Sequence, residues 1–125
     1  PHTMSAFPID STYKNDICPS RESETFVRLN HGRPESAHYY KLWIAEESPA
    51  DREDEGMLRY TLTISDENYH SQDICESDDY DDILRALIKH AATLVILSQI
   101  TAQGSAYDVL MRIISAAKAE LEYEA

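Results

Sequence analysis

Residues 57–88, MLRYTLTISDENYHSQDICESDDYDDILRALI, change their hydrophobic period once, and this change decides the fold. In 57–65 apolar and polar residues alternate, which is typical of a strand with one buried face. From Tyr80 onward apolar residues recur every three or four positions, as on one face of a helix. A polar turn and a weaker extended segment, 69–75, lie between the two patterns. The stretch therefore predicts two strands followed by a helix.

The flanking sequence extends this order in both directions. Residues 24–30 are rich in β-formers and end at a Gly- and Pro-containing break, 31–34, so they predict a strand before a turn. Residues 38–46 predict the next strand, which a polar loop connects to 57–65. Downstream, the apolar helical pattern continues to Gln103-Gly104, where a glycine suits a helix end, and a second helical pattern follows.

Together these segments predict an α+β fold. We expect an antiparallel three- to four-stranded meander followed by a C-terminal antiparallel helical hairpin that packs on one sheet face. Residues 1–3 precede Met4 and have the character of a cloning scar, and 4–23 have weak periodicity and two prolines. We therefore interpret 4–23 as an N-terminal arm and 24–125 as a single domain.

The negative charge is concentrated in one part of the chain. The net charge is −12, and residues 46–82 alone contain fourteen acidic residues against two arginines, so the rest of the chain is balanced. Phosphates would be repelled by such a surface, which argues against direct binding of nucleic acid. A basic protein surface is a natural partner.

Two acidic segments are expected to meet in space. In a meander of 38–46, 57–65 and 69–75, the loop after the first strand and the segment after the third lie at the same end of the sheet. We call this predicted surface the acidic rim. Its members are Glu46, Glu47, Asp51, Glu53, Asp54 and Glu55 from the loop, and Glu76, Asp78, Asp79, Asp81 and Asp82 before and in the helix.

Three interpretations of the acidic rim remain open. The acids before the helix can start it, with Ser77 or Asp78 as the cap and the following acids at the positive end of the helix dipole. The rim can be a hydrated, solubilising surface, or it can dock a basic partner. A metal site is not expected, because an EF-hand loop that began at Asp79 would need glycine at position 84 and glutamate at position 90, where the sequence has Leu84 and His90.

Aromatic residues on the second strand offer possible anchors for a partner. Tyr39 and Trp43 alternate with Leu42 and Ile44, so they face away from the expected core. If that face is open, these side chains are of the type that dominates binding energy in interfaces. The alternative is that the arm, 4–23, covers them.

No catalytic or cofactor motif is present. The sequence contains no Gly-rich phosphate loop, no G-x-S-x-G and no HExxH, and Cys18 and Cys75 form no CxxC pair. We therefore expect no enzyme activity and no cofactor. The longest apolar run, Leu94 to Leu97, is too short to span a membrane. Two cysteines and no export signal after Met4 favour a cytoplasmic protein with reduced thiols.

The sequence thus favours a non-enzymatic, acidic protein-binding domain. The first hypothesis is an inhibitor or immunity-type protein that masks a basic, nuclease-like partner, with carboxylates in place of substrate phosphates. The alternative is a dimeric adaptor or secretion-chaperone-like protein that binds a polypeptide through its sheet or its apolar helix surface. The candidate dimer contact is the widened apolar stripe formed by Leu94, Val95, Ile96, Leu97 and Ile100.

Overall fold

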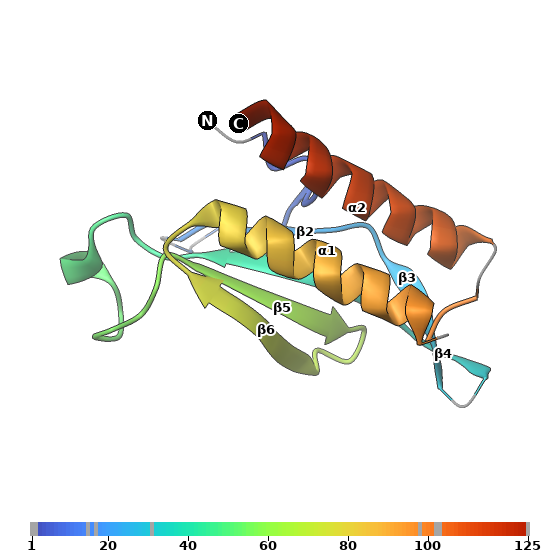
Figure 1. Cartoon of the computed structure of the whole chain (residues 1–125). Coiled ribbons are helices and arrows are strands. Elements are labelled where there is room, and N and C mark those ends of the chain that lie inside the picture. Colours follow the sequence, from blue (N-terminus) through green and yellow to red (C-terminus); the bar gives the residue numbers. More distant parts are fainter. Residues whose placement is uncertain are drawn as a thin grey trace.

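The computed structural model describes residues 3–14, 16, 18–30, 32–97, 99–101 and 104–124. The strands are β1 (Ile9–Asp10), β2 (Ser20–Glu22), β3 (Phe26–Asn30), β4 (Arg33–Ile44), β5 (Tyr60–Asp66) and β6 (Ser71–Ser77), and the helices are α1 (Tyr80–Ile96) and α2 (Ser105–Glu124), with a short 3-10 turn at Pro49–Asp51. The α+β prediction is confirmed. One antiparallel sheet is followed by a helical hairpin that packs on it (Figure 1).

In the described part of the chain the sheet has six strands: β1-β2-β4-β5-β6 follow one another in this order, and β3 pairs with the first half of β4. The predicted meander is β4-β5-β6, and its register places Leu42 opposite Leu62 and Tyr40 opposite Ile64. These four side chains are buried because the alternation directs them toward the helices. The same periodicity that predicted the strands thus also builds the sheet side of the core.

The helices complete the core with one apolar stripe each. Ile83, Leu84 and Leu87 of α1 and Leu110 of α2 are fully buried or nearly so. The two helices lie on one face of the sheet (Figure 1); on the opposite face Trp43 is exposed, although Lys41, Thr63 and Ser65 are buried. Among the described residues, no helix is long and apolar enough to cross a membrane.

The segment expected to be an arm contributes to the fold. Phe7 is fully buried in the core, and β2 pairs with β4, with Arg21 opposite Leu42. Where the structure describes it, the segment 4–23 therefore adds an edge to the sheet beside β4. Pro1 and His2 of the expected cloning scar lie outside the described residues.

Two expected boundaries were wrong. β4 begins at Arg33 and not at residue 38, and Pro34 pairs with Leu29 of β3, so half of the break predicted at 31–34 belongs to the strand. The first residue of that break, His31, lies outside the described residues. The first helix ends at Ile96, well before the glycine expected to end it.

Contacts with β3 explain the early end of α1. The Leu29 N–H donates to the Gln99 carbonyl at 2.6 Å, and the Arg28 guanidinium donates to the Gln99 side chain at 2.5 Å. These bonds hold the chain against β3 and bury Ile100. Gly104, with φ of 103°, instead leads into α2, where its carbonyl accepts from the Asp108 N–H.

Candidate functional site

The two acidic segments meet at one end of the sheet. Tyr60, at the start of β5, pairs with Ile44 at the end of β4 and with Ser77 at the end of β6. The loop between β4 and β5 and the segment entering α1 therefore leave the sheet at the same row of residues. Figure 1 shows this loop, in green, projecting beyond the sheet next to the first turn of α1.

Arg52 joins the two segments. Its side chain is only 6% exposed and donates to the carbonyl oxygens of Glu46 at 2.7 Å, Met57 at 2.9 Å and Glu47 at 3.0 Å. It also forms an ion pair with Asp78 at 3.1 Å. The Asp78 carboxylate in turn accepts from the backbone N–H of Arg59 at 2.9 Å. The acidic loop is therefore closed on a buried guanidinium and fastened to the start of α1.

The acids before α1 have individual structural roles. Asp79 is the N-cap and accepts from the Asp81 N–H, so the expected caps, Ser77 and Asp78, were wrong. The Ser77 hydroxyl accepts from the Asp79 N–H and donates to Asp82. A hydrogen bond from the Arg59 N–H and the nearby Arg52 guanidinium lower the pKa of Asp78. Helix initiation thus explains why some of the acidic residues in this segment are present.

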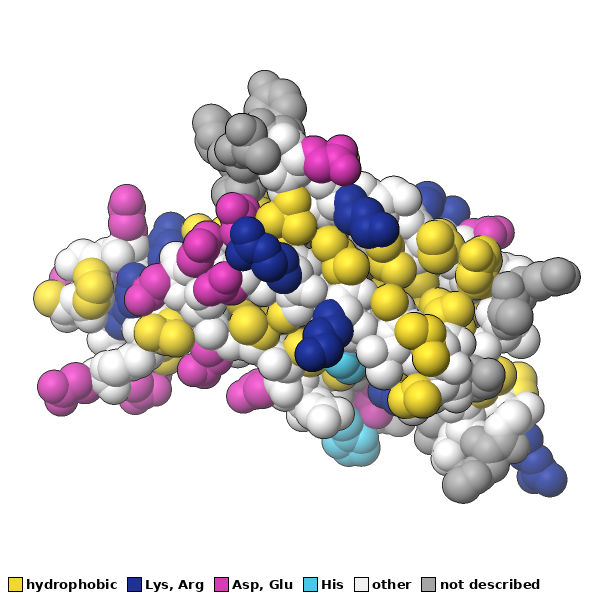
Figure 2. Space-filling view, in the orientation of Figure 1, with side chains coloured by type: hydrophobic (Ala, Val, Ile, Leu, Met, Phe, Trp, Pro, Cys, Tyr) yellow, Lys and Arg dark blue, Asp and Glu magenta, His cyan; other side chains and the backbone are white. Residues whose placement is uncertain are grey.

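Most carboxylates of the acidic rim are nevertheless exposed to solvent. Of its eleven acids, only Glu46 and Asp81 are half-buried; the others are exposed. Figure 2 shows acidic side chains gathered at the end where the loop and the start of α1 lie. Among the described residues, no three acidic, histidine or cysteine side chains converge closely enough to hold a metal ion. The charges share one end of the molecule without meeting at a common point.

The outer sheet face presents the predicted aromatic residues. Trp43 is 43% exposed, and its indole N–H donates to the Thr63 hydroxyl at 3.2 Å. The Lys41 ammonium lies 4.1 Å from the centre of the Trp43 ring and pairs with Glu22 at 3.5 Å. Tyr39 is half-buried, and its burial, followed by the charge of Glu22, raises its pKa. The arm therefore leaves Trp43 accessible.

A groove of about 810 Å³ connects Trp43 with the acidic loop. Thr61 and Thr63 of β5 and Asp73 of β6 line it on the sheet side. At one end it is lined by loop residues, which include Glu46, Asp51, Arg52, Glu53, Met57, Leu58 and Arg59, and on the β2 side it reaches Asp16, Cys18 and Pro19. The groove brings together Trp43 and part of the acidic rim, whereas Tyr39 lies outside it.

No local sequence pattern indicated that Asp73 and Cys18 belong to this groove. A register shift in the β5–β6 pairing, between Leu62 and Thr63, places Asp73 opposite Thr63 and therefore on the outer face. Cys18 reaches the groove only because β2 pairs with β4. Neither feature has a signal in the local hydrophobic pattern.

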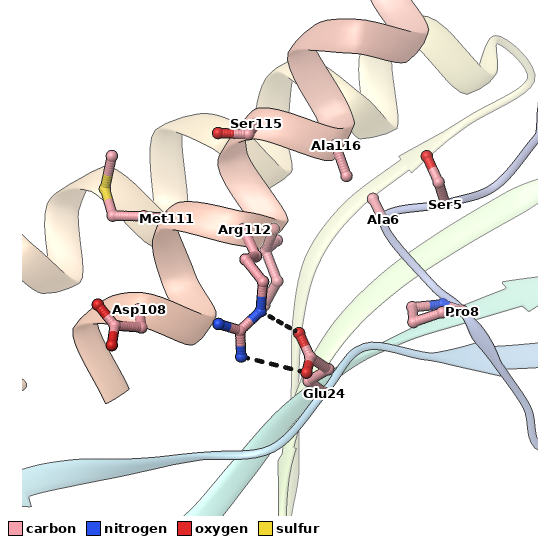
Figure 3. A pocket seen from close by; sticks show the side chains of 10 residues that line it. Ser5, Ala6, Pro8, Glu24, Asp108, Met111, Arg112, Ser115 and Ala116 are labelled. Atoms are coloured by element: carbon pink, nitrogen blue, oxygen red, sulfur yellow. Dashed lines mark hydrogen bonds and ion pairs between the residues drawn. The ribbon is translucent and has the colours of Figure 1, made fainter. Parts of the chain in front are cut away.

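A second cavity, of about 560 Å³, lies between the N-terminal segment and α2 (Figure 3). Ala6 and Ala116 face each other across it, and the Arg112 guanidinium binds both oxygens of Glu24, at 3.0 and 3.2 Å. This bidentate pair joins α2 to the segment before β3. Its main charged groups satisfy each other, so this cavity offers less to a ligand than the groove.

The pKa of both cysteines is raised. Burial, followed by the charge of Glu46, raises the pKa of Cys18, whose thiol lies 3.8 Å from that carboxylate. Burial and then Asp82 raise the pKa of Cys75. A reactive cysteine needs a lowered pKa and a nearby positive group. The arrangement suits recognition of a cationic group better than covalent chemistry.

The fold buries part of the expected dimer contact and exposes the rest. Leu94 and Ile100 are only 3% exposed and belong to the core, and Val95 is half-buried. Ile96 and Leu97 are exposed, and Figure 2 shows apolar side chains around the end of α1. Of the predicted stripe, only Ile96 and Leu97 are therefore exposed to a partner.

In comparisons with known proteins, no family model, no curated protein and no solved structure matches this chain, so any function must be argued from the geometry described above.

Proposed function

We propose that this protein is a non-enzymatic, acidic protein-binding domain that masks a basic partner. The best-fitting class is an inhibitor or immunity-type protein whose carboxylates take the place of substrate phosphates. One observation carries the proposal: Arg52 holds the acidic loop against the start of α1, so that the acidic rim forms a single surface.

Electrostatics supports a cationic partner for this surface. Two unit charges about 8 Å apart in water repel by roughly 0.5 kcal/mol before salt screening, so eleven carboxylates at one end impose a repulsion that a basic surface would relieve. Arg52 is buried within this end, and Arg59 donates to the Ala45 carbonyl, so both arginines bind the protein's own backbone. Their charges only partly offset the acidic rim.

The proposal extends to the cellular compartment and to the lack of catalytic activity. We place the protein in the cytoplasm, where its two free cysteines would remain reduced, and we assign it no cofactor and no enzyme activity. The raised pKa of both thiols supports this assignment.

A competition experiment tests the proposal. Basic proteins from the native cell lysate are retained on immobilised DNA and then eluted with this protein at constant low salt. We expect the wild type to release a specific protein, because its carboxylates compete with phosphates. A variant with Asp54→Asn, Glu55→Gln, Asp79→Asn and Asp82→Asn should not release it.

The control variant carries equally many neutralised acids away from the acidic rim: Asp10→Asn, Glu67→Gln, Asp108→Asn and Glu122→Gln, all exposed in the structure. This control should elute the same protein as the wild type. Elution of nothing by the wild type, or equal elution by both variants, would overturn the proposed function. Circular dichroism establishes that both variants are folded.

Exposure of Ile96 and Leu97 favours a second candidate, a dimeric adaptor or secretion-chaperone-like protein. Two adjacent apolar side chains that are 77% and 60% exposed form the centre of a small contact surface. A dimer that persists in high salt and is lost on Ile96→Glu would support this candidate. A monomer at all salt concentrations would exclude it.

A further inference from the structure

We infer that the groove beside Trp43 receives an arginine side chain from an extended, basic segment of the partner protein. This inference rests on the proposed function and names the chemistry that the partner must present. It depends on three features of the groove: an exposed indole surface, a surplus of carboxylates and cations that are already engaged.

The indole ring is held in place with one side toward solvent. Its N–H is bonded to Thr63, and the Lys41 ammonium lies against the ring. Thr63 and Lys41, which both contact the ring, are only 4% and 8% exposed. The remaining exposure of Trp43 therefore belongs to its other face and its edges. A planar guanidinium can stack on such a face, and little conformational freedom is lost because the ring is already fixed.

The charges around the ring favour a cation. The carboxylates that line the groove are Asp16, Glu46, Asp51, Glu53 and Asp73, and the cations are Arg52 and Arg59. Arg52 is directed into the loop, where it binds backbone carbonyls. The groove therefore offers carboxylate acceptors for the N–H groups of a guanidinium, whereas neutral side chains would form only weaker hydrogen bonds with them, without charge assistance.

The chain carries its own reporter for this contact. Trp43 is the only tryptophan, so tryptophan fluorescence reports on the groove alone. The probe is an unstructured peptide of alternating arginine and serine, and the comparison peptides contain lysine or citrulline in place of arginine. We expect a saturable change in Trp43 emission with the arginine peptide, weaker binding of the lysine peptide and none of the citrulline peptide.

Variants then separate the groove from general charge attraction. Binding is measured by fluorescence polarisation of a labelled arginine peptide, so that Trp43→Ala can be included. We expect Trp43→Ala to weaken binding about two- to thirtyfold, the range of cation–π contacts from exposed to desolvated sites. Tyr69→Ala, which removes an aromatic residue 82% exposed at the β5–β6 turn, should have no effect.

A charge-matched pair of variants completes the test. Asp51→Asn with Asp73→Asn neutralises two groove acids, and Glu67→Gln with Glu122→Gln neutralises two exposed acids outside the groove. The first pair should weaken peptide binding severalfold more than the second. It retains Trp43, so it remains informative if Trp43→Ala fails to fold.

The possible failures are distinguishable. If the two charge-matched pairs weaken binding equally and the lysine peptide binds as tightly as the arginine peptide, the groove does not recognise arginine and the inference is overturned. The proposed function still stands in that case, provided that the competition experiment on immobilised DNA depends on the acidic rim. If that competition fails while the peptide binds in the groove, the proposed function fails and the groove specificity remains.

Discussion

Replacing Arg52 by alanine should open the acidic loop while the sheet and helices stay folded. The guanidinium donates to three backbone carbonyls of the loop, and hydrogen bonds that involve a charged group contribute about 1.5–3 kcal/mol each. The three bonds come from one side chain and do not add independently, so we expect a total loss of about 2–4 kcal/mol. The ion pair with Asp78 adds little to this, because Asp78 is 65% exposed and solvent screens the pair.

Hydrogen exchange measures the effect where it occurs. The hydrogen-bonded amide protons of the loop, those of Asp51 and Met57, should exchange roughly 30- to 1,000-fold faster in Arg52→Ala than in the wild type, the factor that corresponds to about 2–4 kcal/mol. Amides of β4 and β5 near Leu42 and Leu62 should change far less. Binding of a partner through the acidic rim should weaken as well, since the two acidic segments are no longer held together.

Arg85→Ala is the matched control. Arg85 is exposed and makes one ion pair, with Asp82 at 3.2 Å, so its loss should cost below about 0.5 kcal/mol. If Arg52→Ala leaves exchange in the loop at the wild-type rate, or if it resembles Arg85→Ala, then Arg52 does not organise this surface. The physical basis for treating the acidic rim as a single surface would then be wrong.

Three further predictions concern the core. Burial, followed by the charge of Arg28, lowers the pKa of His90 below 6.5, so the unfolded state binds a proton before the folded state as the pH falls. The free energy of unfolding, measured with urea, should therefore decrease below about pH 6.5, and the decrease should be smaller in His90→Gln. Glu120 is 4% exposed and accepts from the Tyr80 hydroxyl at 3.0 Å, so Glu120→Ala should cost about 1–3 kcal/mol of unfolding free energy, and a change under about 0.5 kcal/mol would contradict this role. Leu94→Ala should cost about 2–5 kcal/mol because it leaves a cavity, whereas Ile96→Ala, at a position 77% exposed, should be nearly neutral; equal effects on the thermal midpoint would refute the assigned burial.

Local periodicity predicted the central part of the fold. The alternation around Leu62 and the helical spacing after Tyr80 each depend on one buried face, and this is a property of neighbouring residues. The apolar sides of β4 and β5 therefore lie where the pattern placed them. Weak segments were harder to predict: β2 has three residues and is held by pairing with β4 rather than by its own pattern.

The candidate site was predictable in outline only. Antiparallel connection of three strands is sufficient to bring the loop 46–55 and the segment 76–82 to one end, so their proximity followed from strand order. The groove was not predictable, because it depends on the register shift in β5–β6 and on how the Trp43 ring lies over Lys41 and Thr63.

The sequence by itself determined the order of strands and helices, the sheet face that is buried and the end that carries the negative charge, because each follows from the spacing of residues along the chain. Tertiary structure alone decided that α1 ends at Ile96, that Arg52 lies inside the acidic loop and that Trp43 borders a groove. These features arise from contacts between residues far apart in sequence, such as Leu29 with Gln99. Such contacts form only once the packed elements bring those residues together, so no local pattern encodes them.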